Sequence, residues 1–450
     1  TFSSAGSVAV SEDSSLDLIG TNTAGSADLD SVAGVSDAGA ASVDVTGLLD
    51  VSGTSIALGS GSSVFNAGTL TFSSAGSVNI EEGSSMLVSG SSTAGAGLNL
   101  LSTDDVTLNA SVTVVGDTSI IAGTTSGGIA VNAKLNGSGT ILLDAADEIT
   151  IDAAIDPTTV TLNADDDITV NAAVVASELI TVSAGEDGSG SFILGAAGSL
   201  ETTDSGSDIT VTTGSTSGDI TLTGTTTALD LVTMTTASGW INGSGLVTGD
   251  TVDLNASTGI GDTAGITLSS SNVTADTTTG DVEIANSLGT AVSVSSLATG
   301  SGSVIFNQSG GGDLSTSAVS ASGAVALANA AGSLSLSGTV VSDSLAAIAS
   351  GAITDGSDGD LTIAGLAEFT AGSIELGNDA GNATNFGTLT FSSAGSVAVS
   401  EDSSLDLVGT NTAGSADLDS VAGVSDAGAA SVDVTGLLDV SGTSIALGSG

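Results

Sequence analysis

The residues of this chain best suited to chemistry are closely spaced carboxylates. Three aspartates are consecutive at 165–167, and three more lie within 355–360, where two glycines separate them. Hard oxygen ligands on a tight, glycine-containing loop suit Ca²⁺ or Mg²⁺. We therefore expect no required cofactor, but loose binding of one of these divalent cations. The candidate ligands are Asp165, Asp166, Asp167, Asp355, Asp358 and Asp360.

Paired carboxylates also permit a second chemistry, because one can act as acid and the other as base in glycoside hydrolysis. Glu81–Glu82, Asp104–Asp105 and Asp147–Glu148 are such pairs. The chain has no His, however, and its single basic residue is Lys134. A strongly anionic surface would also repel a uronate substrate. The simpler interpretation is that an aspartate beside a strand accepts hydrogen bonds from turn amides, and we predict that the chain is not an enzyme.

The charge balance excludes several kinds of partner. The chain has 51 acidic residues and one basic residue, for a formal net charge of −50. Contacts with nucleic-acid phosphates or with anionic lipids need Lys and Arg. Apolar runs stay far below the roughly 20 residues needed to cross a bilayer. We therefore expect neither nucleic-acid binding nor membrane insertion of this segment. Disorder is disfavoured because 40% of the residues are hydrophobic.

These acidic residues lie between short segments in which apolar and polar residues alternate. In the segment 219–224 (DITLTG), Ile220 and Leu222 would share one face and Thr221 and Thr223 the other. The same pattern recurs in 105–110, 148–153, 159–164, 167–172, 208–213, 251–256, 281–286, 360–365 and 373–378. A period of two residues indicates strands, and no sustained helical stripe competes with it. The sequence predicts an all-β chain.

The spacing of these segments predicts the architecture. Equivalent apolar positions recur every 19 to 21 residues, as in the pairs Ile149–Ile168, Val160–Ile180 and Val304–Val325. A period of roughly 20 residues with two or three very short strands is typical of a β-helix. A string of immunoglobulin-like sandwiches is the alternative, but it needs a period near 100 residues and usually a buried Trp or a conserved Tyr. The chain has no Tyr and one Trp, Trp240.

A much longer repeat is superimposed on these rungs. Residues 390–450 reproduce residues 1–61 with one difference, Ile19 against Val408. A third, more divergent copy starts at Gly68, where GTLTFSSAGSV matches the sequence from Gly387. We expect one continuous solenoid over residues 1–450, made of a 389-residue block (1–389) and the start of the next copy (390–450). Neither terminus shows a polar capping element, so we expect further blocks to follow end to end.

The rungs resemble those of a known family. Segment 237–287 and the run GSLSLSG (332–338) are similar to the loosely repeated rungs of filamentous-haemagglutinin-like large bacterial exoproteins. That resemblance implies a right-handed parallel β-helix, export to the extracellular bacterial surface, and a role as an adhesin or surface fibre. It extends over nearly the whole chain and is one of composition and period.

Asparagines directly after strands have a structural interpretation. Asn109, Asn163, Asn171 and Asn255 each occupy such a position. Asparagine tolerates left-handed backbone conformation and can stack its amides between rungs. We predict that these residues form the corners of the solenoid.

Three functions remain to be compared. A structural fibre or stalk would be lengthened by copying whole blocks, so the near-exact duplication favours it. A glycan-binding adhesin using the flank of the solenoid is the main alternative, and a polysaccharide-cleaving β-helix is the third. For the fibre we expect further copies of the repeat as partners, end to end and laterally, with a surface glycan or a neighbouring cell as a further contact.

Overall fold

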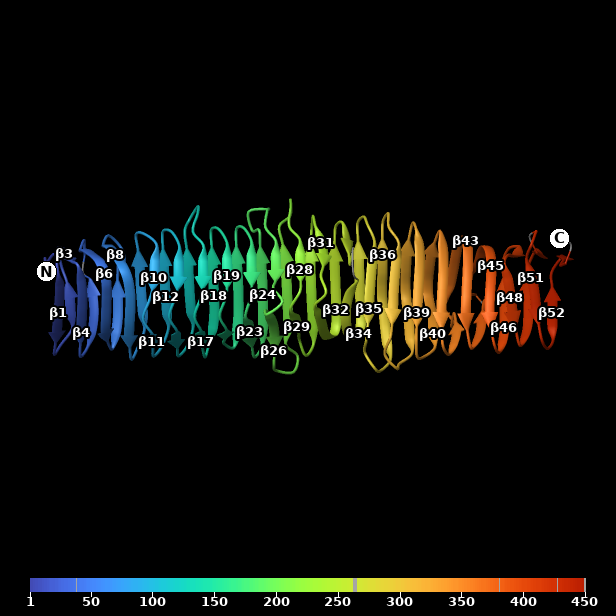
Figure 1. Cartoon of the computed structure of the whole chain (residues 1–450), viewed down its shortest axis with the longest axis horizontal. Coiled ribbons are helices and arrows are strands. Elements are labelled where there is room, and N and C mark those ends of the chain that lie inside the picture. Colours follow the sequence, from blue (N-terminus) through green and yellow to red (C-terminus); the bar gives the residue numbers. More distant parts are fainter. Residues whose placement is uncertain (38, 262–264, 380, 427, 449–450) are drawn as a thin grey trace. The chain divides into compact units, whose positions relative to one another are not determined.

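The chain winds into stacked parallel coils (Figure 1). The computed structural model describes residues 1–37, 39–261, 265–379, 381–426 and 428–448. Within these ranges there are strands, turns and bends but no helix, and hence none long and apolar enough to span a membrane. One coil takes about 21 residues. The structure confirms the predicted all-β β-solenoid.

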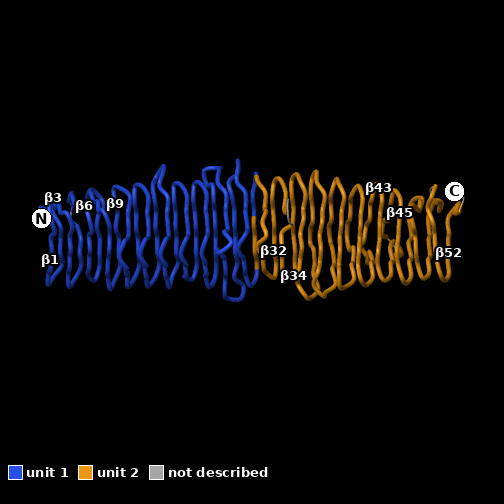
Figure 2. The backbone as a smooth tube through the Cα atoms, in the orientation of Figure 1, with its two compact units in different colours: residues 1–230, 235–238 blue, residues 231–234, 239–450 orange. Residues whose placement is uncertain are grey.

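The chain divides into two compact units (Figure 2). Unit 1 comprises Thr1–Asp230 and Thr235–Ser238, and unit 2 comprises Leu231–Met234 and Gly239–Gly450. Strand β30 (Leu231–Thr236) has residues in both. Each unit is described separately below.

Unit 1 consists mainly of short strands. They are β1 (Ser7–Glu12), β2 (Leu16–Leu18), β3 (Thr21–Ala24), β4 (Ser26–Ser31), β5 (Gly34–Asp37), β6 (Ser42–Gly53), β7 (Ser55–Leu58), β8 (Val64–Ser74), β9 (Val78–Glu82), β10 (Met86–Val88), β11 (Ser92–Ala94), β12 (Leu98–Ser102), β13 (Val106–Leu108), β14 (Val112–Val114), β15 (Thr118–Ala122), β16 (Ile129–Val131), β17 (Leu135–Gly137), β18 (Thr140–Ala145), β19 (Ile149–Ile151), β20 (Ile155–Asp156), β21 (Thr159–Ala164), β22 (Ile168–Val170), β23 (Ala173–Ala176), β24 (Leu179–Ala184), β25 (Phe192–Leu194), β26 (Ser199–Thr202), β27 (Asp208–Thr213), β28 (Ile220–Leu222) and β29 (Thr225–Thr227).

From β9 onward, three strands per coil give unit 1 three faces. One face is the ladder β9–β12–β15–β18–β21–β24–β27. The second starts β10–β13–β16 and the third β11–β14–β17, with every pairing parallel. Each strand therefore pairs with the strand three places later in the sequence, as a solenoid requires.

Unit 2 contains several long strands. Its strands are β31 (Trp240–Asn242), β32 (Leu246–Ala256), β33 (Gly259–Ile260), β34 (Ile266–Thr277), β35 (Val282–Asn286), β36 (Val292–Thr299), β37 (Val304–Gln308), β38 (Leu314–Ala321), β39 (Ala324–Asn329), β40 (Leu334–Ser342), β41 (Ser344–Ala349), β42 (Ala352–Thr354), β43 (Asp360–Ala371), β44 (Ser373–Leu376), β45 (Thr384–Ser393), β46 (Ser396–Glu401), β47 (Leu405–Leu407), β48 (Thr410–Ala413), β49 (Ser415–Ser420), β50 (Gly423–Asp426), β51 (Ser431–Val434), β52 (Leu438–Ser441) and β53 (Ser444–Ala446). Parallel partners here are often only two places apart, as in β34–β36 and β43–β45, because one long strand replaces two short ones.

The registers explain the sequence periods. Ile149 pairs with Ile168, Val160 with Ile180, and Val304 with Val325, so all three predicted spacings are true coil-to-coil partners. Most inward residues of the strands are buried Val, Ile, Leu and Ala, together with six fully buried Phe side chains. Each apolar side chain stacks on a similar one in the next coil, which removes both from water.

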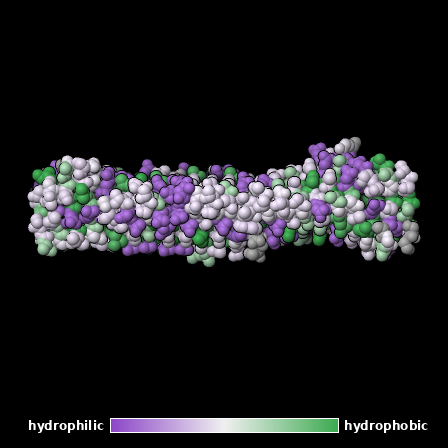
Figure 3. Space-filling view, turned by 90° about the horizontal axis from the view of Figure 1, so that it is seen from above, coloured by the Kyte–Doolittle hydropathy of each residue, from purple (hydrophilic) through white to green (hydrophobic). Residues whose placement is uncertain are grey.

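Amide side chains form ladders at the corners. On the exposed surface of unit 1, Asn132 Nδ2 donates to Asn109 Oδ1 at 2.8 Å, and Asn171 Nδ2 donates to Asp152 Oδ1 at 2.8 Å. The predicted amide stacking is confirmed at Asn109, whereas Asn171 bonds to a carboxylate. The corner position predicted for Asn163 and Asn255 is wrong, because they lie within strands β21 and β32. The surface is mixed, with hydrophilic residues gathered in patches on the face shown in Figure 3.

Candidate functional site

Aspartates at the start of strands link one coil to the next. Asp105 Oδ1, just before β13, accepts the backbone N–H of Gly128 at 3.0 Å. Asp281 Oδ1, just before β35, accepts the N–H of Ser303 at 2.7 Å. Each acceptor lies one coil before its donor, so the carboxylates bind backbone amides of the next coil. The simpler interpretation of strand-flanking aspartates is confirmed at these positions.

The predicted ligands Asp165–Asp167 belong to the same pattern. Asp167 Oδ1 accepts the N–H of Ser191, in the next coil, at 2.7 Å. Asp166 is exposed beside it, and lost hydration, followed by the negative charges of Asp167 and Asp147, raises the pKa of Asp166. The turn therefore concentrates negative charge, as a cation would require, while one of its three carboxylates is already bound to the backbone.

The predicted ligands Asp355, Asp358 and Asp360 have three different roles. Asp355 is 3% exposed, and its Oδ2 accepts the N–H of Gly377 at 2.6 Å. Asp360 Oδ1 accepts the N–H of Ala383 at 2.9 Å, and Asp358 is exposed. Within the described ranges, no group of three or more carboxylates is placed to hold one metal ion. Loose cation binding along these turns stays a prediction.

The Asp355–Gly377 pair depends on a glycine. Gly377 has a φ of 72°, and a Cβ added there would lie 2.0 Å from the backbone oxygen of Ser400. Only glycine fits this backbone conformation without strain. The same arrangement recurs in unit 1, where Asp37 Oδ2 accepts the N–H of Gly59 at 2.7 Å.

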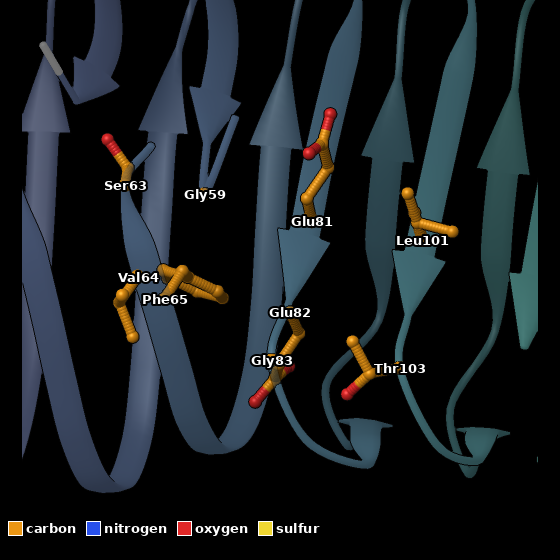
Figure 4. A pocket seen from close by; sticks show the side chains of 9 residues that line it. All are labelled: Gly59, Ser63, Val64, Phe65, Glu81, Glu82, Gly83, Leu101 and Thr103. Atoms are coloured by element: carbon orange, nitrogen blue, oxygen red, sulfur yellow. The ribbon is translucent and has the colours of Figure 1, made fainter. Parts of the chain in front are cut away.

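A buried carboxylate, Glu82, lies at a corner of unit 1 (Figure 4). It lines a cavity of about 210 Å³ together with Gly59, Phe65, Glu81 and Leu101. Glu82 is 2% exposed, and its Oε1 accepts the N–H of Ala67 at 2.7 Å. Its Oε2 is buried without a hydrogen-bond partner in the described part of the chain. Burial raises the pKa of Glu82 to about 7.

Unit 2 repeats this corner at Glu401. Glu401 is 0% exposed, its Oε1 accepts the N–H of Phe386 at 2.8 Å, and burial raises its pKa to about 7. Its Oε2 also has no partner in the described part of the chain. Glu82 and Glu401 follow matching TFSSAGSV segments at the same distance. The corner is therefore a feature of the repeat.

The local cause is a mismatch between neighbouring coils. Strand β8 continues through its corner, whereas the next coil leaves the ladder in the turn after Glu82. The Ala67 N–H then lacks a strand carbonyl, and the Glu82 carboxylate takes its place. In unit 2, a second buried side chain also accepts a backbone N–H in this way: Asn411 Oδ1 accepts the N–H of Phe391 at 3.0 Å. These buried polar side chains act as backbone caps.

Glu82 and Glu401 were not singled out from the sequence as buried residues, although a signal for them exists. In β9, every second residue lies on the same face of the strand, so Val78, Ile80 and Glu82 share a face. The first two point inward. An acid at an inward position of an alternating strand predicts a buried carboxylate. Chemically, such a group can take up or release a proton.

Aromatic side chains offer little outward surface. Six of the eight Phe residues are fully buried. Trp240 is partly exposed in unit 2, and its ring lies so close over Gly259 that an added Cβ would meet it at 2.1 Å. The ring therefore covers the backbone of the following coil.

Neither family models, nor curated proteins, nor solved structures gave a match to the chain. The resemblance to filamentous-haemagglutinin-like exoproteins remains an expectation drawn from the rungs.

Proposed function

We propose that this chain is a structural segment of an extended, acidic surface fibre or adhesin stalk. The observation that carries the proposal is that duplicated sequence forms the same stacked registers in both units. In the first copy Val10 pairs with Leu29, and in the second copy Val399 pairs with Leu418. Another block would therefore add coils through contacts that already exist, and length would scale with block number.

The outward carboxylates support a solvated fibre. Of 51 acidic residues, several serve as coil-to-coil acceptors, and one Lys is present to offset them. A high net charge of one sign keeps such a surface soluble. Mobile cations would then screen the rows of stacked acids and, when divalent, bridge neighbouring carboxylates. In this account the charge acts through bulk cations, and an extracellular location follows from the fibre role.

A glycan-binding adhesin is the second candidate, and Trp240 favours it. A partly exposed indole ring can stack on a sugar face. Its ring already packs on Gly259, however, and six of the eight Phe rings are fully buried. A polysaccharide-cleaving enzyme has less support, because the sequence lacks His and has one basic residue to bind a uronate. We propose no catalytic role.

Glycan binding and a stalk role can be separated directly. The chain and its Trp240→Ala variant are applied to a broad glycan array, with quenching of the single tryptophan as the solution readout. The stalk proposal expects no glycan to be retained by either protein and no quenching of Trp240 in the parent chain. Saturable binding that the Trp240→Ala variant loses would overturn it in favour of the adhesin.

A further inference from the structure

One outward face of unit 2 carries a strip of apolar side chains. Strands β35, β37, β39, β41 and β43 pair in that order, all parallel, in the yellow to orange part of Figure 1. On the middle three strands, the outward apolar residues are Ile305, Ala324, Ala326, Ala328, Ala346 and Ile348. The two isoleucines are 36% and 52% exposed. Contiguous apolar side chains of this kind mark an interaction surface.

The coils that carry this strip are poor in acidic residues. Residues 284–342 contain only Asp313, although the whole chain has 51 acids in 450 residues. Asp313 Oδ1 is already used, because it accepts the N–H of Ser333 at 2.8 Å. Two copies with a formal net charge of −50 each repel one another wherever their acidic turns meet. A second copy can therefore approach these coils with little repulsion, whereas a basic partner would be drawn to acid-rich turns such as 165–167.

Large and small side chains form a two-fold pattern in the strip. Two rows of outward residues run through the three coils, Ile305–Ala326–Ala346 and Asn307–Ala328–Ile348. The central coil has alanine in both rows, and each outer coil has one isoleucine. A half-turn about the strand direction at the central coil exchanges the two outer coils. It places Ile305 of one copy opposite Ala346 of the other, so the surface is complementary to itself.

We propose that two copies of this chain pack laterally through the strip, with their coil stacks running in opposite directions. Each Ile305 then lies over Ala346 of the second copy, so that a large side chain fills the space above a small one. The two Ala326 residues meet at the two-fold axis, where the sheets lie about 10 Å apart. The contact is isologous, because both copies use the same surface.

Two glutamates bracket the strip and limit the strength of this contact. Glu283 lies one coil before Ile305, and Glu368 lies one coil after Ala346. The half-turn brings Glu283 of each copy opposite Glu368 of the other. Repulsion between these surface carboxylates opposes the contact, and salt screens it. Association should therefore strengthen as sodium chloride is added, whereas a contact between opposite charges would weaken.

The strip is small, so a single contact between two 450-residue chains is weak and depends on concentration. In a fibre of several blocks, the strip would recur once per block at a constant spacing. Two fibres running in opposite directions would then make many such contacts at once, and their avidity would exceed the affinity of one contact. The repetition of the contact thus rests on the proposed fibre role, but its formation between two single chains does not.

Single-cysteine variants test the register, because the chain has no cysteine of its own. Ala326→Cys should give a covalent dimer under mild oxidation, since this residue faces its own copy across the axis. Ile305→Cys and Ala346→Cys should each cross-link poorly alone and readily when mixed. The matched control is Ala57→Cys, at a half-buried outward alanine of unit 1 with uncharged neighbours, and it should stay monomeric.

Sedimentation velocity over a concentration series, in chelator, measures the association itself. The parent chain should form dimers as its concentration rises, and Ala326→Asp should abolish them by placing two acids at the axis. The double variant Glu283→Gln, Glu368→Gln should tighten association several-fold. Ala57→Asp should associate like the parent, and circular dichroism confirms that each variant is folded.

Three results would overturn the contact. They are a parent chain that stays monomeric at every concentration, an Ala326→Asp variant that still dimerises, and equal cross-linking of Ala326→Cys and Ala57→Cys. Dimers that form only when Ca²⁺ is added would also overturn it, because they would assign the contact to bridged carboxylates. None of these outcomes bears on growth by block copying, which is tested by particle length, so failure of the strip and failure of the fibre role are distinguishable.

Discussion

Glu82 and Glu401 occupy equivalent corners of the two units, and each places one carboxylate oxygen on a backbone N–H, at 2.7 and 2.8 Å. The second oxygen of each is buried without a hydrogen-bond partner among the residues described. A charged form of either group is therefore poorly solvated, while the neutral form is tolerated.

Stability should consequently fall as pH rises. The folded pKa of each group, about 7, lies above the ordinary value of 4.5, so the folded state binds the proton more tightly. The stabilisation is complete below about pH 4.5 and is lost as pH rises through about 7. At 1.36 kcal/mol per pKa unit the loss is about 3 kcal/mol for each group.

Urea unfolding at pH 5 and pH 8 measures this effect. The double variant Glu82→Gln, Glu401→Gln keeps both acceptor oxygens and should lose much of the pH dependence. The control, Glu368→Gln, changes an exposed acid and should behave like the parent. Equal pH dependence in the double variant and the parent would refute the role of these two groups.

Alanine substitution of a buried and of an exposed apolar side chain should lower the free energy of unfolding by unequal amounts. Ile56→Ala should lower the free energy of unfolding by about 2–5 kcal/mol, because it leaves a cavity under the next coil. Val32→Ala should cost below about 0.5 kcal/mol, because that side chain is 68% exposed. Chemical denaturation of a monomeric sample compares the two, and equal losses would contradict the assigned covering of residue 56.

The coil-to-coil aspartates predict a three-variant series. Asp167→Ala removes the acceptor for the Ser191 N–H and should cost about 1 kcal/mol. Asp167→Asn keeps an acceptor and removes a charge, so it should be neutral or slightly stabilising. Asp166→Ala, at the exposed neighbour, should also stabilise by relieving repulsion. Thermal unfolding at low salt ranks them, and a destabilising Asp166→Ala would argue against this division of roles.

Ionic conditions should change the melting temperature. Acids on successive coils lie about 5 Å apart, so their repulsion is largest in chelator at low salt and is screened as the Debye length falls to about 10 Å. Millimolar Ca²⁺ or Mg²⁺ should raise the melting temperature more than sodium at equal ionic strength, and should promote lateral bundling. If neither the melting temperature nor the bundling changes with any of the three ions, the charge serves solubility alone.

The sequence could predict the fold because the fold is repetitive. The pairs Ile149–Ile168 and Val160–Ile180 are in register because each coil repeats the alternation of the one before. The cation sites were harder, because proximity in sequence is a poor guide in a solenoid. Asp355 and Asp360 are five residues apart, yet each is bound to an amide about one coil away, at Gly377 and Ala383.

Buried Glu82 illustrates the remaining difficulty. The alternation of β9 predicts that its side chain points inward, but its hydrogen-bond partner is the Ala67 N–H, 15 residues earlier. That donor is free only because β8 continues where the following coil turns. The mismatch between two neighbouring coils cannot be predicted from the sequence of either segment alone. It provides the free N–H that allows an acidic side chain to be buried.

The central claim is that copying a block adds coils to one stack. It is tested most directly by electron microscopy of chains with one, two and three 389-residue blocks. At about 21 residues per coil and about 4.8 Å per coil, each block should lengthen the particle by about 90 Å at constant width. Beads on flexible linkers, or a length that does not rise in proportion to block number, would contradict it.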